Sequence, residues 1–131
     1  MLIILTKNLI NLSFVSYINM TEKEIVEKNL KEYSEIAAYS FNKKKFNTAV
    51  TLYYKALVEL CDLELLKKAN KIGANHTERF ELLKEFSPEL YRTASKMFRF
   101  YRDSYNKEIK ETIARLIKEE VEKCIKRFLQ K

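Results

Sequence analysis

The chain has 131 residues and a formal net charge of +7, and 47% of its residues are hydrophobic, which is enough to bury the core of one domain. It has one glycine and one proline, whereas β-sandwiches, barrels and propellers need turn residues about every ten positions. Glycine-rich phosphate-binding loops are excluded for the same reason. We therefore expect an all-α protein, an up-and-down bundle of four to five helices.

The N-terminal segment, residues 1–19, differs from the rest because it carries a single charged residue, a lysine. A signal peptide or membrane anchor is one interpretation, but this lysine and two asparagines interrupt the apolar run and no small-residue cleavage site follows. In the other interpretation Met20 is the natural start, since Thr21 and Glu24 form a capping-box pattern directly after it. We expect an upstream extension or a loosely packed tail, followed by a helical bundle over 20–131.

Apolar residues that recur at three- and four-residue spacing predict the helices. The second expected helix has the widest apolar face and is predicted to be the most buried. Residues 103–106 are the only break between the last two helices, so these are either separate or one long helix. The expected helices cover residues 22–41, 44–69, 76–86, 88–104 and 107–130.

Few residues in the chain are typical helix breakers. Gly73 is expected to adopt the left-handed conformation that often ends a helix. Ser87 and Pro88 fit a helix start, with the serine side chain as the cap and the proline in the first turn. Cys61 and Cys124 lie on apolar helical stripes, which predicts reduced core residues in a cytoplasmic protein.

Groups suited to catalysis are scarce in this sequence. His76 is the only histidine, and its position favours a loop or capping role. No closely spaced cysteine and histidine pairs are present to form a zinc site, and no serine, histidine and aspartate set is evident. We therefore expect neither a metal site nor a cofactor.

The segment from Arg92 to Lys110 combines cations with aromatic residues, among them Phe100 and Tyr101. A basic stripe bordered by aromatic rings holds phosphates and stacks unpaired bases. In the other interpretation the aromatic residues belong to the core and the cations are solvated. The predicted nucleic-acid-binding residues are Arg92, Lys96, Arg99, Arg102, Tyr105, Lys107 and Lys110.

The layout of the helices over residues 22–130 resembles that of HEPN domains, which are small helical bundles. One stretch resembles the motif of active HEPN ribonucleases, an arginine and usually a polar residue, with a histidine four to six positions on. Arg102 and Asp103 match its first two positions, and Lys107 stands at the histidine position. The opening hairpin resembles the family at Ala37, Tyr39, Phe46, Ala49, Tyr53, Ala56 and Glu59.

The resemblance implies Arg102 and Lys107 as the catalytic positions of a metal-independent endoribonuclease. A solvated lysine has a pKa of about 10.4 and is a poor proton-transfer group near neutral pH, where histidine acts well. We therefore expect an RNA-binding or catalytically degenerate relative of toxin-type ribonucleases. The resemblance also implies a homodimer, for which Phe100 suits the interface, and a small nucleotidyltransferase antitoxin as partner. The alternative function is a protein–protein adaptor that uses the hairpin over residues 37–65.

Overall fold

The computed structural model describes residues 20–129, which contain α-helices and no strand. The predicted all-α bundle is thus confirmed for this part of the chain, whereas the interpretations of residues 1–19 lie outside it. No helix among the described residues is long and apolar enough to cross a membrane. In chain order the helices are α2 (Glu22–Asn42), α3 (Phe46–Ala69), α4 (His76–Phe86), α5 (Pro88–Asp103) and α6 (Glu111–Leu129).

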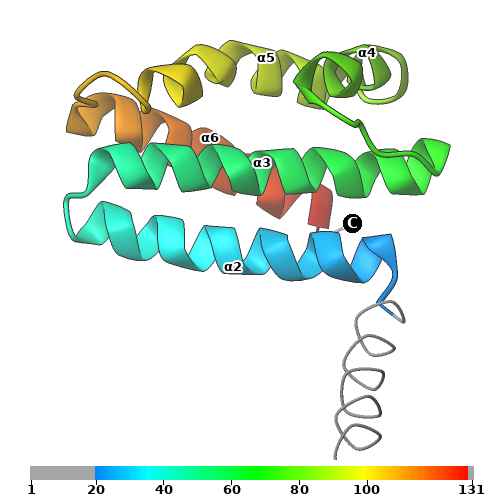
Figure 1. Cartoon of the computed structure of the whole chain (residues 1–131), viewed down its shortest axis with the longest axis horizontal. Helices are drawn as coiled ribbons and strands as arrows, with labels where there is room; N and C mark the ends of the chain where they lie inside the picture. Colours follow the sequence, from blue (N-terminus) through cyan, green and yellow to red (C-terminus); the bar gives the residue numbers. More distant parts are fainter. Residues whose placement is uncertain (1–19, 130–131) are drawn as a thin grey trace, which may run out of the picture.

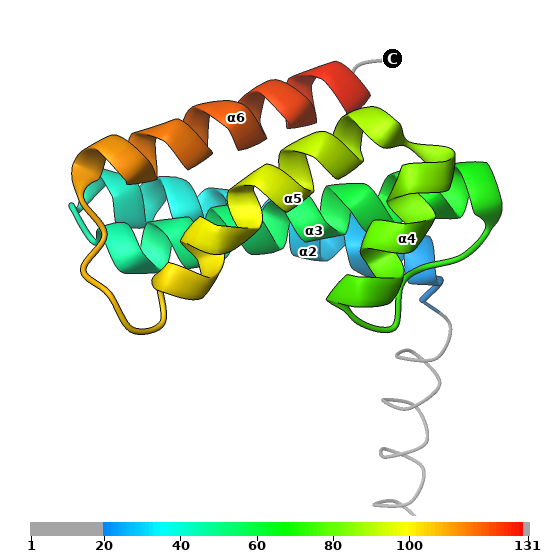
Figure 2. The same ribbon diagram turned by 90° about the horizontal axis from the view of Figure 1, so that it is seen from above.

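The long helices α2, α3, α5 and α6 run alternately up and down, and the short α4 crosses one end of the bundle (Figures 1 and 2). Helix α3 contacts each of the other four helices. Buried side chains therefore surround α3, as the sequence predicts. Burying one large apolar side chain contributes about 1.5–3 kcal/mol, so α3 organises most of the core.

The middle of α3 shows how the core is closed. Tyr54 and Leu57 are fully buried, and the hydroxyl of Tyr54 donates a hydrogen bond to the carbonyl oxygen of Ala94 in α5, at 2.7 Å. Cys61 and Cys124 are buried free thiols, in agreement with their prediction as core residues.

The helix ends confirm one predicted cap and correct another. The hydroxyl of Thr21 accepts a hydrogen bond from the backbone N–H of Glu24, at 3.1 Å. The left-handed residue after α3 is Asn70, with φ 53° and ψ 37°, and Gly73 has no positive φ. Asparagine tolerates this conformation because its short side chain is polar. Gly73 is needed for space, since a Cβ there would lie 2.8 Å from backbone atoms of Arg79.

The junction between α4 and α5 corrects the prediction for Ser87. Its backbone N–H donates to the carbonyl oxygen of Leu83 and its own carbonyl accepts from Tyr91, so one residue ends α4 and begins α5. Its ψ of 72° departs from the usual extended N-cap conformation, and its side chain makes no capping hydrogen bond. Pro88 occupies the first turn of α5, as predicted.

Helices α5 and α6 are separate, and α6 begins at Glu111, four residues later than expected. The side chain of Asn47, at the start of α3, holds the intervening turn. Its amide nitrogen donates to the carbonyl oxygens of Ser104 and Lys107, and its oxygen accepts from the backbone N–H of Ile109, at 3.0 Å. These bonds occupy backbone groups that a continuous helix would use.

Candidate functional site

Four of the predicted nucleic-acid-binding residues lie on α5, and the other three follow it in the turn before α6. Arg92, Lys96 and Arg99 are exposed along one side, as their four- and three-residue spacing requires. None of the three has an ion-pair partner among residues 20–129. The predicted basic stripe is therefore present on the surface.

At the end of this stripe the chain forms a surface hollow of about 320 Å³. Arg99, Lys107 and Lys110 line it together with the carboxylates of Asp103 and Glu108. The ammonium of Lys107 lies 3.4 Å from Asp103, and that of Lys110 lies 3.6 Å from Glu108. Three predicted residues thus come together here, but two of them already face a carboxylate.

Arg102 is the last cation of α5, three residues after Arg99, and Tyr105 lies in the turn that follows. The guanidinium of Arg102 lies over the ring of Phe98, 5.5 Å from its centre, whereas Lys107 pairs with Asp103. Successive residues of a helix point about 100° apart, so Arg102 and Asp103 face different directions. The structure therefore gives Arg102 and Lys107 no common partner, although the motif predicts that they act together.

The aromatic residues between Arg92 and Lys110 include both exposed and buried rings. Tyr105 is 67% exposed and its hydroxyl lies 2.8 Å from that of Tyr101. Phe100 is only 8% exposed and Tyr101 is also buried, so both pack in the core, as the alternative interpretation of the sequence holds. The interpretation that Phe100 exceeds the needs of the core is therefore wrong, because its ring is already covered within one chain, while the homodimer itself stays a prediction.

The acidic residues of α5 are both paired with cations from other segments. Glu89 lies 2.6 Å from Arg127 of α6, and Asp103 pairs with Lys107 of the turn. No other carboxylate belongs to α5. The remaining cations of the helix therefore have no ion-pair partner among residues 20–129, and we call them the α5 cations: Arg92, Lys96, Arg99 and Arg102.

His76 occupies a different place from the loop or cap that its sequence position suggests. It is the first residue of α4, and the cap is Asn75, whose side-chain oxygen accepts from the N–H of Glu78 at 2.9 Å. The imidazole packs against Phe98 and Tyr101 of α5, with ring centres 5.1 and 5.8 Å apart. His76 and Arg102 thus both contact the ring of Phe98.

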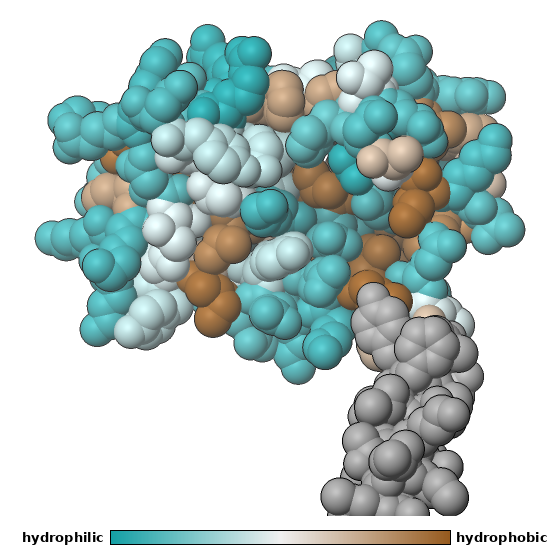
Figure 3. Space-filling view, viewed as in Figure 1, coloured by the Kyte–Doolittle hydropathy of each residue, from teal (hydrophilic) through white to brown (hydrophobic). Residues whose placement is uncertain are grey.

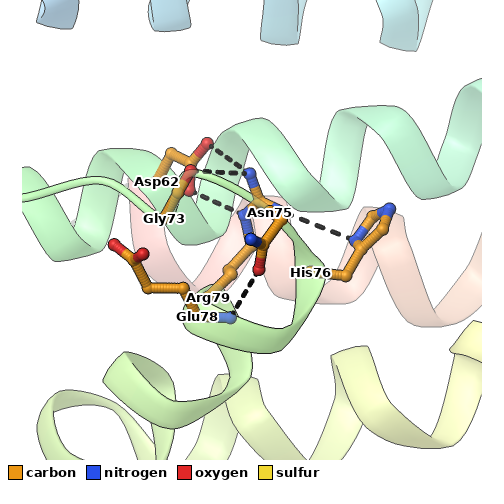
Figure 4. A network of polar contacts seen from close by, with 6 residues as sticks. All are labelled: Asp62, Gly73, Asn75, His76, Glu78 and Arg79. Carbon is orange, nitrogen blue, oxygen red and sulfur yellow. Dashed lines mark hydrogen bonds and ion pairs between the residues drawn. The ribbon is translucent and has the colours of Figure 1, made fainter.

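Arg79 holds His76 in place through a buried network (Figure 4). Its guanidinium lies against the carboxylate of Asp62 in two bonds of 2.8 and 3.2 Å, and its Nη1 lies 3.3 Å from Nδ1 of His76. Because arginine only donates, Nδ1 accepts, and the imidazole proton is assigned to Nε2. Burial lowers the pKa of His76, and the charges of Arg79 and Lys55 lower it further, so the ring is neutral near pH 7.

A pocket of about 300 Å³ opens beside this network. We call it the His76 pocket; its lining residues come from α2, α3, the loop after α3, α4 and α5. Burial and the charge of Asp62 raise the pKa of Glu59 in this pocket to about 7, so its carboxyl group exchanges a proton near neutral pH. The lining residues are Tyr33, Lys55, Val58, Glu59, Ala74, Asn75, His76, Arg79 and Tyr101.

Most of the His76 pocket was not predicted from the sequence. One signal is present in the sequence, because Lys55, Glu59 and Asp62 recur at four- and three-residue steps and so place charges on one face of α3. Arg79 had no such signal, since its partner lies 17 residues away. No group of three or more histidine, cysteine or acidic side chains is positioned to hold a metal ion within residues 20–129. Comparison with protein-family models, curated proteins and solved structures found no match for this chain.

Proposed function

We propose that this chain is a HEPN-like protein that binds RNA through the α5 cations. The observation that supports the proposal is the charge balance of α5, whose two carboxylates are paired elsewhere while Arg92, Lys96, Arg99 and Arg102 are exposed without an ion-pair partner among the described residues. Such cations are available to neutralise phosphates, and the release of counterions from the RNA favours binding.

The exposed ring of Tyr105 supports RNA as the nucleic acid. It stands at the C-terminal end of α5, beside Arg102. Exposed aromatic rings next to cations stack the splayed bases of single-stranded RNA. Arg102 contacts Phe98 and Lys107 pairs with Asp103, so the two motif positions have different partners, which favours binding over the ribonuclease chemistry that the HEPN resemblance implies for them.

The double variant Lys96→Ala/Arg99→Ala tests the proposal. We expect its affinity for a fluorescent single-stranded RNA at low salt to fall at least about tenfold, because two phosphate contacts are lost. The matched control is Lys28→Ala/Lys31→Ala, which removes two exposed cations of α2. An equal loss in both double variants would show that only total charge matters and would contradict a site on α5.

The HEPN resemblance adds two proposals about assembly, a homodimer and a small nucleotidyltransferase partner. Light scattering of the purified chain tests the first, and co-purification with the product of a neighbouring gene tests the second. A chain that is monomeric at all concentrations would contradict the homodimer. A neighbouring nucleotidyltransferase that does not bind the chain would contradict the proposed partner.

The protein–protein adaptor is a second candidate, which the surface of α2 favours. Ile36 is 48% exposed and Tyr39 is 59% exposed, although the sequence pattern places Ile36 on the buried face. Figure 3 shows hydrophobic side chains at the surface over α2. An adaptor would bind a protein partner that the variant Ile36→Ser/Tyr39→Ser no longer binds, and its RNA affinity would be unmeasurable even at low salt.

A further inference from the structure

The His76 pocket has the composition of a site for a small flat ligand. Its volume of about 300 Å³ lies at the lower end of the range for small-molecule pockets, about 300–1,000 Å³. Tyr33, Val58, Ala74 and Tyr101 supply apolar and aromatic wall. Polar groups reach the same space from α3 and α4, so the pocket offers both contact area and hydrogen bonds.

The hydrogen-bonding groups of the pocket are of two kinds. Glu59 offers two carboxylate oxygens, which accept, and Asn29 of α2 donates a hydrogen bond to this carboxyl group. The ammonium of Lys55 and the Nε2–H of His76 are the hydrogen-bond donors that the pocket offers to a ligand. Arg79 is already bound to Asp62, the carbonyl oxygen of Gly73 and Nδ1 of His76, so its role is to hold the imidazole with Nε2–H available.

Guanine is the nucleobase that matches this set. Its pairing edge carries two adjacent N–H donors, N1–H and the N2 amino group, which suit the two oxygens of one carboxylate. Its O6 and N7 are adjacent acceptors, which lysine and other donors recognise. Adenine and cytosine each present an acceptor where guanine presents N1–H, so an ionised Glu59 would repel that atom.

The place of the pocket relative to α5 agrees with a base-binding role. Tyr101 lines the pocket and is hydrogen-bonded to Tyr105, and Arg102 shares the ring of Phe98 with His76. A phosphate at Arg102 is therefore close to a base that enters the pocket. This juxtaposition links the proposed RNA surface to a site that distinguishes bases.

We propose that the His76 pocket binds an unpaired guanine base, with Glu59 accepting from its N1–H and N2 amino groups and with Lys55 and His76 donating to O6 and N7. The inference deepens the proposed RNA binding, because it names the base that the RNA site prefers. Recognition of a flipped base by its pairing edge and by stacking is common in proteins that act on single strands.

Guanosine without a phosphate is the first probe, because it tests the pocket independently of the α5 cations. His76 is the only histidine, so its imidazole signals in NMR spectra report on the pocket alone. We expect guanosine to shift these signals, and adenosine, cytidine and uridine to bind at least about tenfold more weakly. Equal binding of all four nucleosides, or none of guanosine, would overturn the proposal.

The variant Glu59→Gln tests the assigned role of the carboxylate, and Lys55→Met tests a second donor in case the first variant fails to fold. Glutamine presents one acceptor and one donor, so we expect at least about a tenfold loss of guanosine affinity. The matched control is Glu35→Gln, an exposed carboxylate of α2. Guanosine affinity that survives both Glu59→Gln and Lys55→Met would contradict the assignment.

Binding by wild type should also strengthen from pH 6 to pH 8, because Glu59 must be ionised. The groups that face Glu59 are Asn29 and Tyr33 of α2, Lys55 and Asp62 of α3, His76 and Arg79 of α4, and Tyr101 of α5. The pKa of His76 is lowered by burial and by the charges of Arg79 and Lys55, so its imidazole loses its proton at lower pH than usual, while the pKa of Glu59 is about 7. Stronger guanosine binding at pH 6 would contradict the proposed contacts.

Single-stranded RNA that carries one guanine among uridines distinguishes an RNA site from a site for free nucleosides. A preference over all-uridine RNA that Glu59→Gln abolishes would support recognition within RNA. If guanosine binds but guanine-containing RNA binds no more tightly than all-uridine RNA, the proposal that the guanine belongs to RNA would be overturned. Loss of RNA affinity in the α5 double variant with guanosine binding retained would separate the pocket from the phosphate surface, so failure of one proposal does not conceal failure of the other.

Discussion

Arg79 is a buried cation whose partners determine both its own position and the state of His76. Arg79 is 9% exposed and its charge is compensated by Asp62 through two hydrogen bonds. Removing one partner of a buried pair leaves the other charge without compensation, which costs about 3–5 kcal/mol. Exposed pairs contribute about 0–1 kcal/mol, because water screens them.

The variant Arg79→Met should therefore lower the free energy of unfolding by about 3 kcal/mol. In the same variant the pKa of His76 should rise, since the charge of Arg79 is one of the causes that lower it. Urea denaturation measures the first effect and NMR titration the second. The control is Arg115→Met, which loses an exposed pair with Glu111; a similar loss of stability in both variants would contradict the importance given to burial.

The role of a single residue can be predicted from the sequence when its partner lies nearby in the chain. Thr21 caps α2 because its partner is three residues away. The residue type predicts a left-handed conformation at Gly73, but Asn70 adopts it, and the glycine is required by the close approach of Arg79. Packing between two segments does not appear in the local sequence pattern. The sequence therefore indicates that position 73 is special, but it does not predict that the reason is the contact with Arg79.

At the scale of the element, Asn47 connects the start of α3 to the turn between α5 and α6. Its side chain bonds the backbone of Ser104, Lys107 and Ile109. Helix bounds were predicted well wherever apolar periodicity marks them. The local pattern predicts the start of α6 four residues too early. The turn before it is held by hydrogen bonds from Asn47, a residue 57 to 62 positions away, which the sequence around the turn does not reveal.

The variant Asn47→Ala should lower the free energy of unfolding by about 2 kcal/mol, since three backbone groups lose a partner. The control is Asn106→Ala, an exposed residue of the same turn. Unchanged stability in Asn47→Ala, measured by thermal and urea denaturation, would contradict the role given to these bonds.

The apolar spacing of α2 predicts a wider buried face than the helix has. Apolar spacing placed both Ile36 and Ala37 on the buried face, but Ala37 is fully buried and Ile36 is 48% exposed. Among the other helices α2 packs mainly on α3. One neighbour covers a narrower stripe than several neighbours would, so the sequence pattern overstated the width of the buried face.

At the scale of the whole molecule, the fold class followed from composition, while the site depended on how the helices meet. The basic stripe could be predicted because it lies within α5. The His76 pocket could not, because it requires α4 to cross the bundle and bring His76 and Arg79 against Glu59 and Tyr101. The structure also shows where part of the formal charge of +7 lies. The carboxylates of α5 are paired with cations of other segments and, within residues 20–129, its four cations are not, so α5 carries unpaired positive charge.

The salt dependence of RNA affinity tests the central claim that the α5 cations bind phosphates. On single strands each phosphate contact contributes about 0.7 to the slope of log affinity against log salt. We predict that Lys96→Ala/Arg99→Ala reduces the magnitude of the slope by about 1.4 relative to wild type, while Lys28→Ala/Lys31→Ala leaves it unchanged. Identical slopes in wild type and Lys96→Ala/Arg99→Ala would contradict the claim.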